Sequence, residues 1–156
     1  MLTTQGFRDV LLIGRQDRDE KDLYNLHREP LISLVPRERI FGIPERIDAS
    51  GKVLIPLDTE TVHRVVSNLY AAGIRAIAVC FLNSYRNNEH ERRCGEVIRE
   101  SYPEIAYSLS SEVDPTFREF ERFSATVVNA YSLPVVKSYL TNLVQGLRTI
   151  GVTAPV

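Results

Sequence analysis

The chain has 156 residues, 44% of them hydrophobic, and its 19 basic and 20 acidic residues leave a formal net charge of -1. This size and composition are typical of one globular domain, residues 1–156, and the balanced charge argues against a nucleic-acid partner. No apolar stretch is long enough to span a bilayer, and the N-terminus lacks the pattern of a signal peptide. We therefore expect a cytoplasmic protein that has neither a nucleic-acid nor a membrane partner.

Residues 1–57 have the less regular hydrophobic pattern. The segment from Phe7 to Ile13 is predicted to be helical. Two weakly alternating segments, residues 39–47 and 52–55, flank the turn signal from Asp48 to Gly51. The first part of the chain is therefore predicted to form a helix and a β-hairpin.

Residues 58–156 alternate between helical and strand patterns. Asp58 can cap a helix that ends at Gly73, and the stripe of that helix comprises Val62, Val65, Val66 and Leu69. Residues 74–81 are almost entirely apolar, which is typical of a central strand covered on both faces of a parallel sheet.

A second helix and strand follow. Asn88 and Glu91 resemble a capping box, Pro103 marks the end of the helix, and residues 105–109 form a short predicted strand. The buried stripe of this helix would comprise Cys94, Val97 and Ile98. Cys80 lies on the preceding strand, so both cysteines are interpreted as small core residues rather than as a disulfide or a nucleophile.

A third helix is predicted to start with Asp114 as N-cap and Pro115 in the first turn. Its inner face would comprise Phe117, Phe120, Val127 and Val128. Pro134 requires either a kink or a new helix starting near Ser132. After that point the inward side chains would be Val136, Tyr139, Leu140, Leu143 and Leu147.

Together these elements predict an α/β fold of βαβα units with a largely parallel sheet and right-handed crossovers, plus the N-terminal helix and hairpin. Both ends resemble interrupted elements: residues 2–4 read as the end of a strand and residues 154–156 as the approach to another. The chain is therefore expected to be a fragment of a larger protein.

Polar side chains follow both predicted buried strands, in residues 83–88 and 110–114. Ligands gather at such strand ends, but helix caps and turns explain these residues as well. The same choice applies to the charged segment from Arg118 to Arg122, which fits either surface ion pairs or a site. Burial of Glu119 or Arg122 beside the strand ends would favour the site, because buried charges are costly.

Metal and phosphate motifs are missing from the sequence. The histidines at positions 27, 63 and 90 are isolated, His63 is expected at the surface, and no metal site is predicted. The sequence also has no GxGxxG, GxxxxGK[ST] or GxSxG motif.

An ordered set of short motifs resembles the hydantoinase A / 5-oxoprolinase family, which includes subunits of acetone carboxylases. Each motif is weak alone, but their order matches across nearly the whole chain. They are residues 2–10 with 13–16, residues 35–37 with 44–48, residues 76–81 with 84–85 and 90–91, and residues 108–113 with 118–122 and 127–131.

The resemblance implies a parent enzyme with an actin/Hsp70-like core that uses ATP with Mg to open cyclic amides such as hydantoin, N-methylhydantoin or 5-oxoproline. The reaction would pass through a phosphorylated amide. The family's glycine-rich phosphate segments would lie outside residues 1–156, so the chain alone is not expected to be active. A hydantoinase B type subunit or domain is the implied partner.

The resemblance also suggests residues near a substrate or nucleotide cleft, of which Arg15 could bind a carboxylate or phosphate through two hydrogen bonds. The candidates are Thr3, Thr4, Arg8, Arg15, Gln16, Ser111, Glu112, Glu119 and Asn129. Asn83 stands where the family often has histidine, and Asn88 where it often has proline, so the substrate stays open.

Two other functions fit the same sequence. The chain could be a non-catalytic α/β interaction module that supports a partner subunit, which predicts an exposed hydrophobic face. It could also belong to the carboxylase branch, which shares the expected fold and ATP dependence with the hydrolases.

Overall fold

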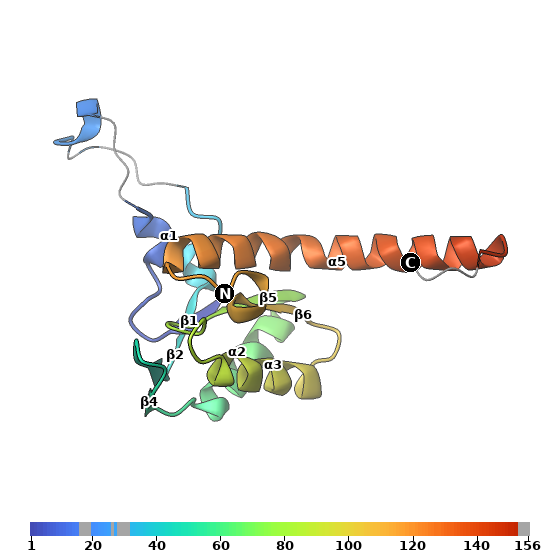
Figure 1. Cartoon of the computed structure of the whole chain (residues 1–156), viewed down its shortest axis with the longest axis horizontal. Coiled ribbons are helices and arrows are strands. Elements are labelled where there is room, and N and C mark those ends of the chain that lie inside the picture. The colour runs from blue at the N-terminus through green and yellow to red at the C-terminus, as the bar shows by residue number, and fades with distance from the viewer. Residues whose placement is uncertain (16–19, 26, 28–31, 153–156) are drawn as a thin grey trace.

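The computed structural model describes residues 1–15, 20–25, 27 and 32–152 (Figure 1). A four-stranded parallel sheet has the order β2-β1-β5-β6, and a two-stranded antiparallel hairpin lies beside it. The strands are β1 (Leu2–Thr4), β2 (Phe41–Ile43), β3 (Arg46–Ile47), β4 (Val53–Ile55), β5 (Ala76–Cys80) and β6 (Ala106–Leu109). The helices are α1 (Val10–Ile13), α2 (Thr59–Ala71), α3 (Glu89–Ser101), α4 (Ser110–Val113) and α5 (Glu119–Thr149), with 3-10 turns at Glu20–Asp22 and Arg37–Arg39.

The sheet lies between two helical layers: α2 and α3 cover one face and α5 covers the other (Figure 1). The α2/α3 side buries an apolar cluster of Leu2, Ile43, Val62, Val66, Ile77, Val79, Phe81, Cys94, Val97, Ile98 and Leu109, among others. The α5 side buries Met1, Leu11, Ile40, Ala78, Cys80, Phe123, Val127 and Ala130. The predicted α/β fold with a parallel sheet is confirmed.

The central unit, α2 followed by β5, forms as its sequence predicts. The Asp58 carboxylate accepts a hydrogen bond from the Thr61 backbone N–H at 2.9 Å and thereby caps α2. Just past the helix, Gly73 adopts a φ of +81°, a conformation that costs glycine little. Strand β5 pairs with β1 on one side and β6 on the other, so it is central.

The N-terminal part differs in detail from its prediction. Residues 2–4 do form a strand, whereas the helix expected from Phe7 covers only α1. The hairpin forms from β3 and β4, but β2 leaves it and pairs with β1 in the main sheet. The reason is that Ile40 and Ile43 belong to the two opposite apolar clusters, so this segment needs cover on both faces.

The predicted capping box at the start of α3 is wrong. Asn88 makes no side-chain cap, and the Asn87 side-chain oxygen accepts instead from the Glu89 backbone N–H at 3.0 Å. The side chain of Glu91 turns inward. The predicted core cysteines are confirmed: Cys80 and Cys94 are free and fully buried, and burial raises the pKa of both thiols.

The start of α5 is also corrected. The helix begins at Glu119, and Asp114 instead accepts a hydrogen bond from the Thr116 hydroxyl in a turn. Phe120 and Val127 face inward as predicted, but Phe117 and Val128 are 68% and 54% exposed. Phe117 precedes the helix and therefore does not follow its period. The inward face is completed by Phe123, Thr126 and Ala130.

Helix α5 continues through Pro134 without the restart considered near Ser132 (Figure 1). The hydroxyl of Ser132, two residues before the proline, donates to the Val128 and Asn129 carbonyls at 3.0 and 3.1 Å. Beyond Pro134 the helix extends past the sheet, so side chains predicted to face inward lack a covering layer. Those exposed are Val136, Tyr139, Leu140 and Leu143. The strand expected near residues 154–156 lies outside the described residues.

Candidate functional site

Polar side chains meet at the carboxyl ends of the parallel strands. Thr4 ends β1, Glu45 follows β2, residues 81–84 follow β5 and Ser110 follows β6. Thr4, Glu45, Ser84 and Ser110 are all buried. This edge of the sheet is where open α/β folds bind ligands.

A first buried cluster joins Glu45, His90 and Thr4. One Glu45 carboxylate oxygen lies 2.7 Å from His90 Nδ1, and the other accepts a hydrogen bond from the Thr4 hydroxyl. The Thr4 hydroxyl in turn accepts from the Leu82 backbone N–H at 2.9 Å. The cluster thus ties the ends of β1, β2 and β5 to the first turn of α3.

A second buried cluster joins Glu91, Ser110 and Arg122. Glu91 accepts hydrogen bonds from the Ser110 hydroxyl at 2.6 Å and from the backbone N–H groups of Phe81 and Ser111, each at 2.8 Å. Arg122 Nε donates to the Ser110 oxygen at 3.2 Å. A serine hydroxyl therefore bridges a buried carboxylate and a buried guanidinium.

The environment of Glu91 has two opposing effects on its acidity. Burial raises the pKa of Glu91, and hydrogen bonds from Ser110, Phe81 and Ser111 offset part of that rise. Arg122 is fully buried beside the strand ends. That burial favours the site interpretation of the charged segment over simple surface pairing, because a desolvated charge is expensive.

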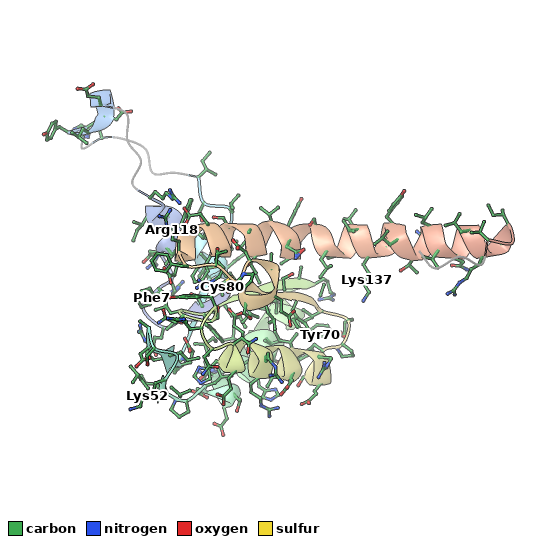
Figure 2. All side chains as sticks on the ribbon, viewed as in Figure 1. Phe7, Lys52, Tyr70, Cys80, Arg118 and Lys137 are labelled. Carbon is green, nitrogen blue, oxygen red and sulfur yellow. The ribbon has the colours of Figure 1, made fainter. Side chains whose placement is uncertain are left out.

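An open cleft of about 960 Å³ lies next to these clusters. The loop around α1 forms one wall, and the residues that start α5 form the other, so that Phe7 and Arg118 lie at the same end of the molecule (Figure 2). The lining residues are Gly6, Phe7, Asp9, Val10, Ile13, Gly14, Arg15, Leu82, Asn83, Phe117, Arg118, Glu119, Phe120 and Glu121. Aromatic and apolar surface is thus combined with several charges.

Two cleft residues have unusual backbone conformations. Asn83 has a φ of 54° and Arg118 a φ of 93°, and these are the non-glycine residues with positive φ in the part of the chain that the structure describes. Such conformations cost on the order of 1–3 kcal/mol and persist where the surroundings hold them. Both therefore mark positions that their neighbours constrain.

The candidate residues from the sequence are only partly brought together. Arg15 and Glu119 line the cleft, where Arg15 pairs with Glu121, and Glu119 lies 3.7 Å from Arg122 Nη2. Gln16 lies outside the described residues.

The other candidates do not line the cleft. Thr3 and Thr4 are fully buried, and the Thr3 hydroxyl has no hydrogen-bond partner among the residues that the structure describes. Arg8 donates to the Arg37 carbonyl at 2.9 Å. The backbone of Ser111 holds Glu91, Glu112 is exposed, and Asn129 is half-buried on α5.

Sequence reasoning did not identify Glu45 and Glu91 as buried groups, although two periodic signals could have done so. Ile43, Glu45 and Ile47 alternate with period two, and all three are buried. Glu91 precedes Cys94 and Ile98 at helical spacing on the same buried stripe. His63 is exposed as expected.

Among residues 1–15, 20–25, 27 and 32–152, no three His, Cys, Asp or Glu side chains gather in a way that could hold a metal ion. Within the same ranges, no helix is both long and apolar enough to cross a membrane.

The profile of the hydantoinase/oxoprolinase N-terminal region matches residues 1–102. The caprolactamase subunit alpha of Pseudomonas jessenii is 32% identical over 155 residues, which are 99% of this chain and 22% of that protein. The 5-oxoprolinase of Saccharomyces cerevisiae is 33% identical over 174 residues, 94% of this chain and 13% of that protein. The chain thus spans under a quarter of the length of these relatives.

Two solved structures resemble this chain over most of its length. The crystal structure of the ATP-dependent caprolactamase from Pseudomonas jessenii superposes with a TM-score of 0.83 at 32% identity, over 99% of this chain and 22% of that one. Acetone carboxylase in its nucleotide-free form gives a TM-score of 0.72 at 27% identity, over 83% of this chain and 20% of that one. The chain belongs to the family of hydantoinase/oxoprolinase N-terminal regions.

Proposed function

We propose that the chain is the N-terminal region of an ATP-dependent enzyme that opens a cyclic amide, and that the cleft beside the sheet contributes to its substrate or nucleotide site. The observation that carries this proposal is the match to the ATP-dependent caprolactamase over 99% of the chain. A lactam ring is a cyclic amide, as are hydantoin and 5-oxoproline. ATP would phosphorylate the amide oxygen, with release of ADP, and thereby make the amide carbon more open to attack by water. The ring C–N bond would then break, and hydrolysis of the resulting acyl phosphate would release phosphate.

The cleft suits a small ring that carries polar groups. Phe7, Phe117 and Phe120 offer apolar surface, while Arg15, Arg118 and Glu119 offer charge. Among described residues, Arg118 makes no ion pair, whereas Arg15 would have to exchange Glu121 for a carboxylate or phosphate. In this proposal the chain's residues bind and orient a ligand, and the glycine-rich segments that hold the phosphates of ATP lie elsewhere in the enzyme.

The candidates that do not line the cleft are proposed to support its walls; they are Thr3, Thr4, Arg8, Ser111, Glu112 and Asn129. Gln16 stays a candidate for the cleft itself. Thr4 and Ser111 support the cleft through Glu45 and Glu91. ATP with Mg, a cytoplasmic location and a hydantoinase B type partner complete the proposal. A partner is consistent with relatives that are named as subunits, such as caprolactamase subunit alpha.

The test is ATP hydrolysis, with and without caprolactam, hydantoin or 5-oxoproline, by this chain and by a longer protein that continues it as its relatives do. We expect substrate-stimulated hydrolysis by the longer protein and none by the 156-residue chain. Wild-type turnover and Michaelis constant in an Arg15→Ala variant would remove Arg15 from the site. Stimulation by acetone with bicarbonate instead of a cyclic amide would place the protein in the carboxylase branch.

An interaction module is the second candidate, and the exposed face of α5 favours it. Tyr131, Val135 and Tyr139 are 84%, 73% and 63% exposed on one side of the helix. A soluble protein seldom leaves such a stripe uncovered. Two results together would favour the module. The longer protein would hydrolyse no ATP with any of these substrates, and it would bind a partner subunit whose binding is lost in the Val135→Glu and Tyr139→Glu variants.

A further inference from the structure

We propose that Arg122 is a positioning residue: it holds the two strained segments that line the cleft, residues 82–83 and 117–118, in the shape that receives the ligand. The inference rests on the proposed function of the cleft. Arg122 is fully buried and does not line the cleft, so it acts through the backbone that it holds.

The guanidinium of Arg122 joins three separate segments. Nη2 donates to the Phe81 carbonyl at 3.1 Å, Nη1 donates to the Thr116 carbonyl at 2.9 Å, and Nε donates to the Ser110 hydroxyl at 3.2 Å. These acceptors belong to the end of β5, the loop before α5 and the start of α4. A lysine could not reach three acceptors in the same planar arrangement.

Both strained residues lie two positions after a carbonyl that Arg122 holds. Asn83 follows Phe81, whose backbone N–H is held at the same time by Glu91 at 2.8 Å. Arg118 follows Thr116 in the same way. The Arg118 carbonyl also accepts a hydrogen bond from the Arg122 backbone N–H at 3.3 Å. The strained backbone on both sides of the cleft is therefore attached to one side chain.

Simple space filling does not account for Arg122. Its guanidinium lies 5.5 Å from the ring centre of Tyr85 and 5.3 Å from that of Phe123, so a methionine could pack in the same place. Methionine would avoid the cost of burying a charge. What methionine lacks are the hydrogen bonds to Phe81, Thr116 and Ser110.

The first test measures backbone conformation in the 156-residue chain, by the three-bond couplings between the α protons of Asn83 and Arg118 and the carbonyl carbons of the residues that precede them, which are large at positive φ and small at negative φ. We expect Arg122→Met to shift both couplings toward those of negative φ and to speed amide exchange at residues 82–83 and 117–118 at least about tenfold, because hydrogen bonds to a charged group are lost. Arg122→Lys should give an intermediate result.

The matched control is Val127→Ala, five residues further along α5 and also buried, in the apolar cluster between α5 and the sheet. It should lower thermal stability while leaving both couplings unchanged. If Arg122→Met does not fold, Arg122→Lys decides the question. Wild-type couplings in the Arg122 variants, or equal changes in Val127→Ala, would overturn the proposal.

The second test uses caprolactam-stimulated ATP hydrolysis by the longer protein. Arg122→Met should raise the Michaelis constant for caprolactam at least about tenfold, as for the loss of a hydrogen bond to a charged group, and should change kcat less. An equal loss in Val127→Ala would show a structural role only. Absence in the wild type of hydrolysis stimulated by caprolactam, hydantoin or 5-oxoproline would refute the proposed function, and the couplings would still decide the role of Arg122.

Discussion

The two halves of α5 differ in what covers them. Residues 119–130 pack Phe123, Val127 and Ala130 against the sheet, whereas residues 131–149 leave Val135 and Tyr139 exposed. Tyr139 follows Phe123 by 16 positions, about 4.4 turns, so it points to nearly the opposite side of the helix. One continuous helix thus presents apolar residues to the sheet in its first half and away from it in its second.

This comparison predicts that truncations in the two halves have very different costs. Phe123→Ala should lower the free energy of unfolding by about 3–5 kcal/mol, because it leaves a cavity between α5 and the sheet. Urea denaturation followed by circular dichroism measures the change. A loss below about 1 kcal/mol, which is closer to the effect of a surface substitution than to that of a core cavity, would mean that α5 does not anchor on the sheet as described.

Pro134 lies between the two halves and sharpens the comparison. Pro134→Ala supplies the missing backbone N–H and removes a clash in the helix interior, which is worth about 3 kcal/mol in a helix. Because the second half has little tertiary packing, the gain should show as slower amide exchange in residues 131–149. Unchanged exchange there would contradict this prediction.

The Glu91 cluster supports the first half through Ser110 and Arg122, and its stability should depend on pH. The folded-state pKa of Glu91 is raised, so the folded protein keeps a proton that the unfolded chain has lost. The free energy of unfolding therefore falls as the pH rises from the usual glutamate pKa of 4.5 to the raised pKa of Glu91 in the folded protein. Below pH 4.5, Glu91 is protonated in both states and does not lower the stability. Glu91→Gln should lose this dependence.

Unfolding free energies of the wild type and Glu91→Gln, measured between about pH 4 and pH 8, provide the check. The wild type should lose stability relative to the variant as pH rises. A constant difference would mean that Glu91 does not titrate in this range.

The smallest effect is expected in the second half of α5. Tyr139→Ala should change the unfolding free energy of this chain by less than about 0.5 kcal/mol, because the side chain is largely exposed. The same denaturation assay applies. A loss comparable with that of Phe123→Ala would show that the second half packs on something within the chain itself.

The regular part of the fold could be predicted from the sequence because its signals are local. The apolar stripe of α2 recurs at helical spacing, and β5 lies within a nearly continuous apolar run. By contrast, three-residue β2 offers too short a pattern to separate it from the adjacent hairpin. The apolar residues after Pro134 were expected to face inward, yet most of them are exposed, because periodicity alone does not say what covers a stripe.

The candidate site was harder to predict, because its contacts join residues distant in sequence. Glu45 meets His90, and Glu91 meets Phe81 and Ser110, across 10 to 45 positions. Asn88 and Glu91 match a capping motif locally, but the Glu91 carboxylate instead accepts hydrogen bonds from Phe81 and Ser110 in the core. Arg15 and Glu119, which the family resemblance suggested, do line the cleft: Arg15 lies just after α1, and Glu119 begins α5.

The most direct test of the central claim is amide hydrogen exchange of the longer protein during turnover of ATP and a cyclic amide such as caprolactam. We expect slower exchange in residues 6–15, 82–83 and 117–121, the three segments that contain the lining residues of the cleft. Substrate-dependent hydrolysis with unchanged exchange in these three segments would contradict the assignment of the cleft to substrate or nucleotide binding.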